Sequence, residues 1–122
     1  MGEEVVPSAT IESTYLYWRD NFFLPDGAPR YYHDRTYPLD IQCAAQAIAT
    51  LATCAGLDVG AVDRAHLVLQ WTKERLRRDD GLYGYRRGRR LANRLVTLHW
   101  GQSTMLEALG VLLERCRAET GV

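Results

Sequence analysis

One segment, Ile41 to Leu57, limits the fold of this chain more than any other. Its first ten residues are Ile-Gln-Cys-Ala-Ala-Gln-Ala-Ile-Ala-Thr, so small or apolar side chains fall on nearly every side of a helix drawn through it. A helix with this pattern packs closely against other helices in an inner layer. Asp40 is a suitable N-cap just before the helix, and Gly56 closes it. The rest of the chain, or a partner, must therefore bury this helix.

Apolar periodicity predicts three further helices, over about residues 8–23, 59–78 and 100–118. The first has an aromatic face, and Asp58 is placed to cap the second. The apolar side of the last helix consists of Met105, Leu106, Leu109, Leu112, Leu113 and Cys116. Together with residues 41–57, these helices predict an all-α fold.

Two long segments between the predicted helices lack helical periodicity. Arg30 to Asp40 is predicted to be irregular or briefly extended, because Pro38 disfavours helix at the residue before it. After an Asp79-Asp80-Gly81 turn, residues 82–98 mix tyrosine, glycine and arginine, which leaves room for a short two-stranded β-ribbon. If successive helices are antiparallel, the chain forms two antiparallel α-α hairpins with both long loops at the same end.

Composition narrows the class of protein. The 122 residues, 47% of them hydrophobic and 25% charged, fit one folded soluble domain over residues 1–122, or part of a larger one. No apolar run approaches the roughly 20 residues needed to cross a bilayer. The start, Met-Gly-Glu-Glu, is acidic, whereas a secretory signal begins with basic residues. We therefore expect a cytoplasmic protein that does not contact the membrane.

The three cysteines predict neither a metal site nor a disulfide. They form no C-x-x-C pair and have no histidine at metal-ligand spacing. Cys43 and Cys54 share one predicted helix and lie about 16 Å apart along it, too far for a disulfide. We interpret them, with Cys116, as free buried thiols. His66 lies on the apolar side of its predicted helix and is interpreted as a satisfied core residue. No cofactor is expected.

Three motifs follow one another along the chain. They are Arg30-Tyr31-Tyr32-His33-Asp34-Arg35-Thr36-Tyr37-Pro38-Leu39-Asp40-Ile41 with Ala44-Ala45-Gln46-Ala47, then Asp79-Asp80-Gly81-Leu82-Tyr83-Gly84-Tyr85-Arg86, then His99-Trp100-Gly101-Gln102 with Met105 and Leu106. In this order they resemble a segment of bacterial α/α-toroid proteins. That group includes six-hairpin glycosidase-like and prenyltransferase-like toroids, and the likeness is to its polysaccharide-associated members.

The resemblance implies that this chain supplies only part of a ring. Such a toroid needs about six hairpins to bury its inner helices, and the chain offers two. We therefore expect either a homo-oligomer or additional N-terminal hairpins. The chain departs from the family pattern at His99, Thr104 and Gln42, where the family tends to show arginine, tryptophan and histidine. These departures favour ligand contact over catalysis, and they leave enzymatic activity an open question.

The two long loops hold the candidate ligand-binding residues. Flat aromatic faces with a polar edge stack on sugar rings, and the resemblance implies a polysaccharide or sugar as the ligand. The arginines of the second loop favour an acidic polysaccharide, because a guanidinium binds carboxylate. The predicted ligand-binding residues are Tyr32, His33, Tyr37, Tyr83, Tyr85, His99, Trp100 and Gln102. The alternative for Tyr83, Tyr85 and Trp100 is a minor core that seals the hairpins. The alternative function is a non-enzymatic helical interaction or oligomerisation module.

The sequence offers only nominal candidates for catalytic residues. Glycoside hydrolysis needs two carboxyl groups that flank the scissile bond, and Asp34 and Asp40 are the pair that the first long loop offers. His33 is the only general acid or base there with an ordinary pKa near neutrality. We favour the simpler interpretation, in which Asp40 caps a helix and Asp34 pairs with Arg30 or Arg35.

The strongest charge feature is the arginine-rich second loop. The net charge is zero, yet residues 73–94 carry nine basic and three acidic side chains. The candidate anion-binding residues are Arg86, Arg87, Arg89 and Arg90. Arginine binds carboxylate or phosphate through two parallel hydrogen bonds. The simpler interpretation is a solvated loop. A weaker alternative function is an anion or nucleic-acid binder through this loop, and nucleic acid is the less expected partner because no aromatic-interleaved nucleic-acid motif is present.

Overall fold

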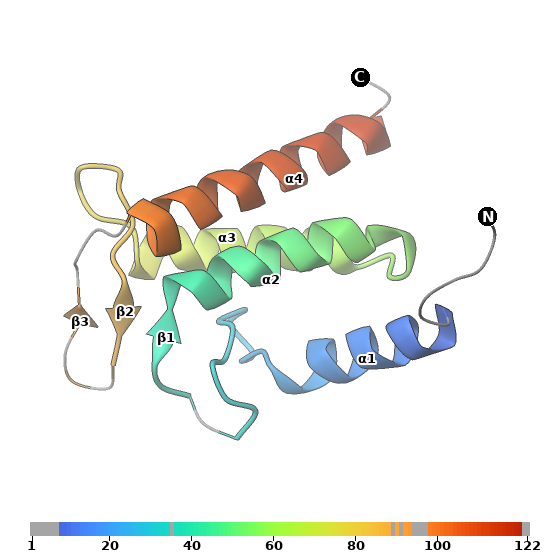
Figure 1. Ribbon diagram of the computed structural model, residues 1–122, viewed down its shortest axis with the longest axis horizontal. Coiled ribbons are helices and arrows are strands. Elements are labelled where there is room, and N and C mark those ends of the chain that lie inside the picture. The colour runs from blue at the N-terminus through green and yellow to red at the C-terminus, as the bar shows by residue number, and fades with distance from the viewer. Residues whose placement is uncertain (1–7, 35, 89, 91, 94–97, 121–122) are drawn as a thin grey trace.

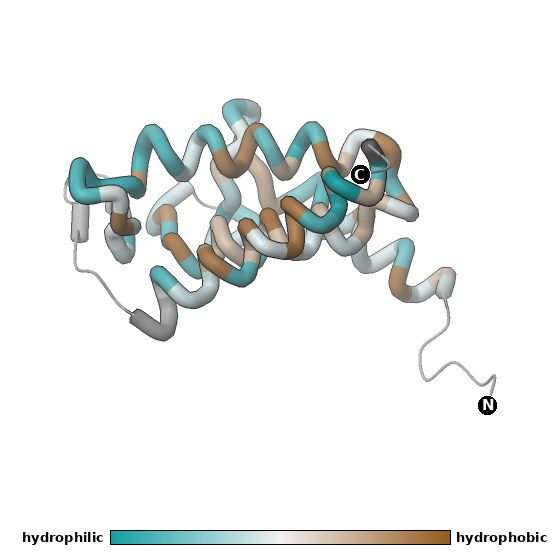
Figure 2. The backbone as a smooth tube through the Cα atoms, turned by 90° about the horizontal axis from the view of Figure 1, so that it is seen from above, coloured by the Kyte–Doolittle hydropathy of each residue, from teal (hydrophilic) through white to brown (hydrophobic). Residues whose placement is uncertain are grey.

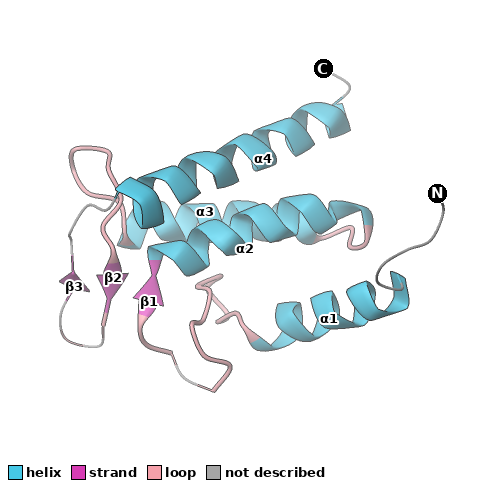
Figure 3. Ribbon diagram, viewed as in Figure 1, coloured by secondary structure: helices cyan, strands magenta, loops and turns pink. Residues whose placement is uncertain are grey.

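The computed structural model describes residues 8–34, 36–88, 90, 92–93 and 98–120, and this part of the chain is mostly helical (Figures 1 and 3). It contains α1 (Ser8–Asn21), α2 (Ile41–Thr53), α3 (Ala61–Arg75) and α4 (Thr104–Thr120). A 3-10 turn, Cys54–Gly56, follows α2, and a π-helical turn, Leu98–Ser103, leads into α4. No helix of the described residues is long and apolar enough to span a membrane.

Helix α2 lies at the centre of the helical layer, where it packs on α4 and on α3. Successive helices reverse direction in Figure 1, and both long loops lie at the same end of the bundle. The packing nevertheless differs from two separate hairpins, because α3 and α4 contact α2 far more than they contact each other. Tyr15 is the only fully buried residue of α1, so α1 is the peripheral helix.

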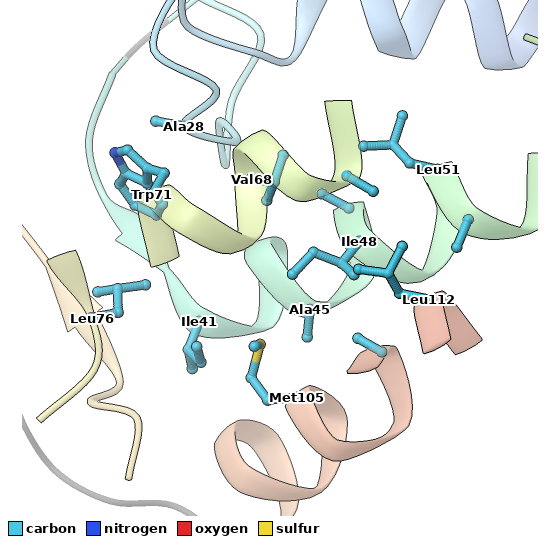
Figure 4. Packing of buried hydrophobic residues seen from close by; sticks show 14 of the residues in the cluster. Ala28, Ile41, Ala45, Ile48, Leu51, Val68, Trp71, Leu76, Met105 and Leu112 are labelled. Atoms are coloured by element: carbon cyan, nitrogen blue, oxygen red, sulfur yellow. The ribbon is translucent and has the colours of Figure 1, made fainter. Parts of the chain in front are cut away.

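The core forms where the small side chains of α2 allow its neighbours to approach (Figure 4). Ile41, Ile48 and Leu51 are completely buried. Met105 of α4 and Val68 of α3 reach the core from the two sides. The prediction that α2 is an inner helix is therefore confirmed on these faces. Gln42 and Gln46 are exposed, so burial does not extend all round the helix as its composition suggested.

The predicted apolar side of the last helix is only partly buried. Met105 and Leu112 are in the core, whereas Leu106 is 74% exposed and Leu113 is 52% exposed. Hydrophobic and hydrophilic residues alternate in short blocks along the helices (Figure 2), and α4 carries both kinds on its outer surface. The six predicted positions span more of the helix circumference than a single neighbour, α2, can cover.

A small antiparallel sheet joins the two long loops at one end of the bundle. It consists of β1 (Leu39–Asp40), β2 (Arg86–Arg87) and β3 (Ala92–Asn93), in that order. Asp40 is in register with Arg86. The backbone N–H of Ile41 donates to the carbonyl of Tyr85 over 2.9 Å. Strands β2 and β3 fall within residues 82–98, the segment for which a short ribbon was considered.

Helix boundaries and caps differ from the predictions in ways that local contacts explain. The helix predicted over residues 59–78 begins at Ala61, and its N-cap is Gly60, so Asp58 is not the cap. The carboxylate of Asp58 instead accepts the Gly60 N–H and the hydroxyl of Tyr15. At its C-terminal end the helix stops at Arg75 and a turn follows, in which Gly81 has φ +86°.

The cysteines carry no disulfide, as predicted, but each is half-buried and not fully enclosed. His66 is exposed on α3, so its interpretation as a core residue was wrong. The reason is its position on the helix: Ala65 and Val68 lie on the buried side of α3, whereas His66 and Leu67 lie on the exposed side.

Candidate ligand-binding site

The loop from Arg30 to Asp40 begins at a tight turn that packs against α3. Its first residue, Arg30, is held in place by its own backbone N–H, which donates to the carbonyl of Phe22 over 2.8 Å. Gly27 has φ +92°, and a Cβ atom there would lie 3.0 Å from the side chain of Leu67. The guanidinium of Arg30 then crosses the loop and donates from Nη1 to the carbonyl of His33 over 2.7 Å. The Tyr37–Pro38 peptide bond is cis.

Asp40 closes the loop, and both of its carboxylate oxygens are occupied. The side chain is 2% exposed. Oδ1 accepts the backbone N–H of Gln42 over 2.7 Å, which confirms Asp40 as the N-cap of α2. Oδ2 accepts from Nε of Arg86 over 2.6 Å. The nominal catalytic pair of Asp34 with Asp40 therefore has no support, because Asp40 serves as a cap and an ion-pair partner.

Arg86 lies between two aromatic rings. Its guanidinium carbon is 5.3 Å from the ring centre of Tyr31 and 4.9 Å from that of Tyr85, distances typical of cation-π contacts. The hydrogen bond with Asp40 raises the pKa of Arg86 above its usual value, so this side chain stays charged. Arg86 was predicted to bind an external anion, and the structure shows that its Nε is already paired with an internal one.

Of the other predicted anion-binding residues, Arg87, Arg89 and Arg90, the structure describes the side chain of Arg90 alone. Arg90 is exposed. Arg89 lies outside the described residues, and so does the side chain of Arg87. The prediction for Arg87, Arg89 and Arg90 therefore remains a prediction.

A hollow of about 340 Å³ lies between α1, α2 and the start of the loop. We call it the aromatic hollow. It is lined by Trp18, Phe22, Pro29, Arg30, Tyr31, Gln42, Cys43, Gln46 and Ala47. Three of these side chains offer aromatic faces, and two offer amides that both donate and accept hydrogen bonds. Burial raises the pKa of Cys43 to about 11, so its thiol is a neutral part of the wall at pH 7.

Arg30 lines this hollow and carries a donor without a partner in the described part of the chain. Its Nε is buried and has no hydrogen-bond partner among the described residues. A buried donor without a partner costs about 1–3 kcal/mol, more when it is charged. An acceptor that enters the hollow and reaches this N–H would recover that free energy. The guanidinium is therefore the most specific polar group at the site.

The aromatic hollow continues along α1. A second hollow of about 510 Å³, which is largely apolar, shares Trp18 and Gln46 with the aromatic hollow and extends past Ile11 and Thr50. A larger hollow of about 660 Å³ lies between the end of α1 and α3. We do not take it as the site because its charged groups include Arg19, which already pairs with Asp20 and Asp58.

Two of the side chains predicted in the first loop, Tyr32 and His33, have ring contacts with residues that line the hollow. Tyr32, His33 and Tyr37 are exposed. The rings of Tyr31 and Tyr32 meet edge to face with centroids 4.8 Å apart, and the His33 ring is 6.3 Å from that of Phe22. Asp34 is also exposed. Tyr32 and His33 therefore lie beside the lining residues Tyr31 and Phe22, whereas Tyr37 is not among the residues that line the hollow.

The ligand-binding residues predicted in the second loop have, in part, a structural role. The side-chain amide of Gln102 accepts the N–H of Tyr83 over 2.9 Å and donates to its carbonyl over 2.7 Å. Gln102 therefore fixes the backbone of the second loop and has its amide occupied. Tyr83 and Tyr85 are half-buried and pack against the core, which fits the minor-core alternative. The side chains of His99 and Trp100 lie outside the described residues.

Sequence reasoning did not assign the residues that form most of the hollow. Trp18 and Phe22 were placed on the aromatic face of the first helix but not at a site. Gln42 and Gln46 are four residues apart in an otherwise apolar stretch, so they share one face of a helix. That pair of amides is the sequence feature that could have predicted an exposed side of α2. Among the described residues, no group of three or more His, Cys, Asp or Glu side chains is placed to hold a metal ion.

Comparisons with protein-family models, curated proteins and solved structures found no match to this chain. The function must therefore be argued from the geometry of the site.

Proposed function

We propose that this chain binds an acidic polysaccharide, with one sugar unit in the aromatic hollow, and that it does so without catalysing a reaction on it. The single observation that carries the proposal is that Arg30, whose buried Nε has no partner among the described residues, lines the same hollow as three aromatic side chains. A sugar ring stacks on an aromatic face, and a uronic acid carboxylate accepts from a guanidinium.

The walls of the hollow support a sugar more than an apolar ligand. The amides of Gln42 and Gln46 lie one turn apart along α2 and can donate to or accept from sugar hydroxyl groups, although the Gln46 amide nitrogen already donates to the hydroxyl of Thr50. The second hollow continues from Trp18 along α1, which gives a chain longer than one sugar a surface to follow. Binding without catalysis is favoured because Asp40, one of the two nominal carboxylates, is committed to Gln42 and Arg86.

Titration with galacturonic acid oligomers of three to six units, followed by NMR, tests this proposal. The expected shifts are at the Nε–H of Arg30, the indole N–H of Trp18 and the side-chain amides of Gln42 and Gln46. Neutral galactose oligomers of equal length are the control ligand and are expected to bind at least about tenfold more weakly, since a charge-assisted hydrogen bond contributes about 1.5–3 kcal/mol.

The variant Arg30→Gln should lose about tenfold or more in affinity for the acidic oligomers while its circular dichroism spectrum stays unchanged. Arg75→Gln is the matched control, because Arg75 is an exposed arginine at the end of α3 that does not line the hollow. The proposal is wrong if millimolar acidic oligomers produce no shifts at these four groups. Equal affinity of the Arg30→Gln variant would equally refute the role of the guanidinium.

The second candidate function is self-association, in line with the resemblance to toroids that need more hairpins than this chain offers. Leu106 and Leu113 are seven residues apart on α4, so they lie on one side of the helix, and both are exposed. Gly110 lies between them, and a Cβ atom there would meet nothing within 4 Å. We propose that this face packs against a second copy of the chain. Light scattering tests the proposal.

A further inference from the structure

A cysteine and a histidine meet between α3 and α4, away from the aromatic hollow. Sγ of Cys116 lies 3.6 Å from Nε2 of His66, and the two residues are 50 positions apart in the sequence. Cys116 is half-buried and His66 is exposed, so small molecules in solvent can reach this contact. His66 also lines a hollow of about 370 Å³ together with Leu69, Gln70, Lys73 and Glu74.

This contact sets Cys116 apart from the other two cysteines. The thiolate is the reactive form of a cysteine, and a neighbouring imidazole promotes it by accepting the proton and then stabilising the negative sulfur. Burial raises the pKa of Cys43 to about 11 and also raises the pKa of Cys54, which disfavours their thiolates. No imidazole contact is recorded for Cys43 or Cys54 among the described residues.

We propose that Cys116 is a modification site, where His66 activates the thiol for exchange with a low-molecular-weight disulfide. The proton of the thiol passes to Nε2 of His66, and the Cys116 sulfur attacks one sulfur of the disulfide. A new S–S bond forms to Cys116 as the S–S bond of the reagent breaks. The released thiolate takes the proton from His66, so one thiol and one disulfide are consumed and one of each is produced.

The charged side chains around the pair act in opposite directions. Residues three or four apart on a helix share a face. Asp63 on α3 lies one turn from His66, and Glu119 on α4 lies one turn from Cys116, so each places a negative charge near the pair. Lys73, two turns along α3 from His66, carries a positive charge. The end of α2 and the 3-10 turn, Cys54–Gly56, contribute no charged side chain, and Arg115 is turned toward the carbonyls of Ala52 and Thr53.

The test is reaction of the full chain with hydroxyethyl disulfide, a neutral reagent whose reactivity does not depend on the charge of the site. Peptide mapping by mass spectrometry reports the rate at each of the three cysteines. At pH 7 we expect Cys116 to react at least about tenfold faster than Cys43 or Cys54. An ordinary thiol with a pKa near 8.5 loses about fiftyfold in thiolate between pH 8.5 and 6.5. We expect Cys116 to lose less than about tenfold over this interval.

The variant His66→Gln should slow Cys116 by about tenfold at pH 7 and restore the steep pH profile of an ordinary thiol. His33→Gln is the matched control, because His33 is also exposed but belongs to the first loop, and it should change neither quantity. Since His66 is exposed, the variant is expected to fold, and the pH profile of the unsubstituted protein provides a second test. The proposal is overturned if Cys116 reacts no faster than the other two cysteines, or if His66→Gln leaves its rate and pH profile unchanged.

Discussion

Replacement of Arg86 by methionine should destabilise the fold more than any other arginine substitution in the second loop. Methionine keeps the length and much of the apolar volume of the side chain but has no donor for Asp40. The carboxylate of Asp40 is 2% exposed, so its Oδ2 would lose its charged partner while still largely shielded from water. A buried charge left without its partner is strongly destabilising.

The magnitude follows from the contacts that are lost. A hydrogen bond to a charged group contributes about 1.5–3 kcal/mol. Each of the two cation-π contacts, with Tyr31 and Tyr85, adds about 0.5–1 kcal/mol at an exposed site. Breaking a fully buried pair costs about 3–5 kcal/mol, but the Arg86 side chain is 37% exposed and solvent screens part of this. We therefore expect Arg86→Met to lower the free energy of unfolding by about 3 kcal/mol.

Urea denaturation monitored by circular dichroism measures this loss. The melting temperature should fall by about 12 °C, at roughly 4 °C per kcal/mol for a domain of this size. Arg90→Met is the matched control and should stay within about 0.5 kcal/mol. Asp40→Asn retains an N-cap but removes the charge, so a double-mutant cycle with Arg86→Met should give a coupling free energy of about 2 kcal/mol. A coupling near zero, or equal stability of the two methionine variants, would refute the reasoning.

Two further outcomes are expected. The hydrogen bond from Tyr15 lowers the pKa of Asp58, so the stability it contributes is present above about pH 4, the unfolded value, and is lost as the pH falls through the lower folded value. Urea midpoints from pH 7 to 2 should therefore fall less steeply for Asp58→Asn than for the unsubstituted protein, and parallel profiles would contradict the assignment. Light scattering should show a species larger than a monomer at high protein concentration. The double variant Leu106→Glu/Leu113→Glu should shift it to a monomer, whereas Leu57→Glu, on an exposed turn, should not, and a monomer throughout would exclude self-association.

The features that the sequence predicted correctly are those encoded by neighbours along the chain. The inner position of α2 follows from its run of small apolar residues, because burial requires such side chains on several faces at once. The cap at Asp40 follows from a short polar side chain immediately before a helix, and its Oδ1 accepts the Gln42 N–H as expected. The irregular loop follows from Pro38. Each of these predictions needs only a few consecutive residues.

The features that it missed depend on contacts between distant residues. Asp58 suits an N-cap by its position, but Tyr15, 43 residues earlier, supplies a hydroxyl that holds the carboxylate beside Gly60. His66 has an apolar residue on either side in the sequence, yet it is turned out of the core and toward Cys116, 50 residues later. Helical periodicity predicts on which side of the helix a side chain lies. It does not determine which neighbouring helix covers that side.

The aromatic hollow depends on the ion pair between Asp40 and Arg86, although neither of these residues lines it. Arg86 contacts the ring of Tyr31, which lines the hollow, and Asp40 holds the end of the loop to α2. Loss of Arg86 should therefore weaken ligand binding by loosening the loop, together with a loss of stability. Loss of the Arg30 guanidinium should weaken binding with a smaller loss of stability, because the contact it removes is the hydrogen bond from Nη1 to the His33 carbonyl within an exposed loop. The two variants thus separate a group that contacts the ligand from one that positions the site.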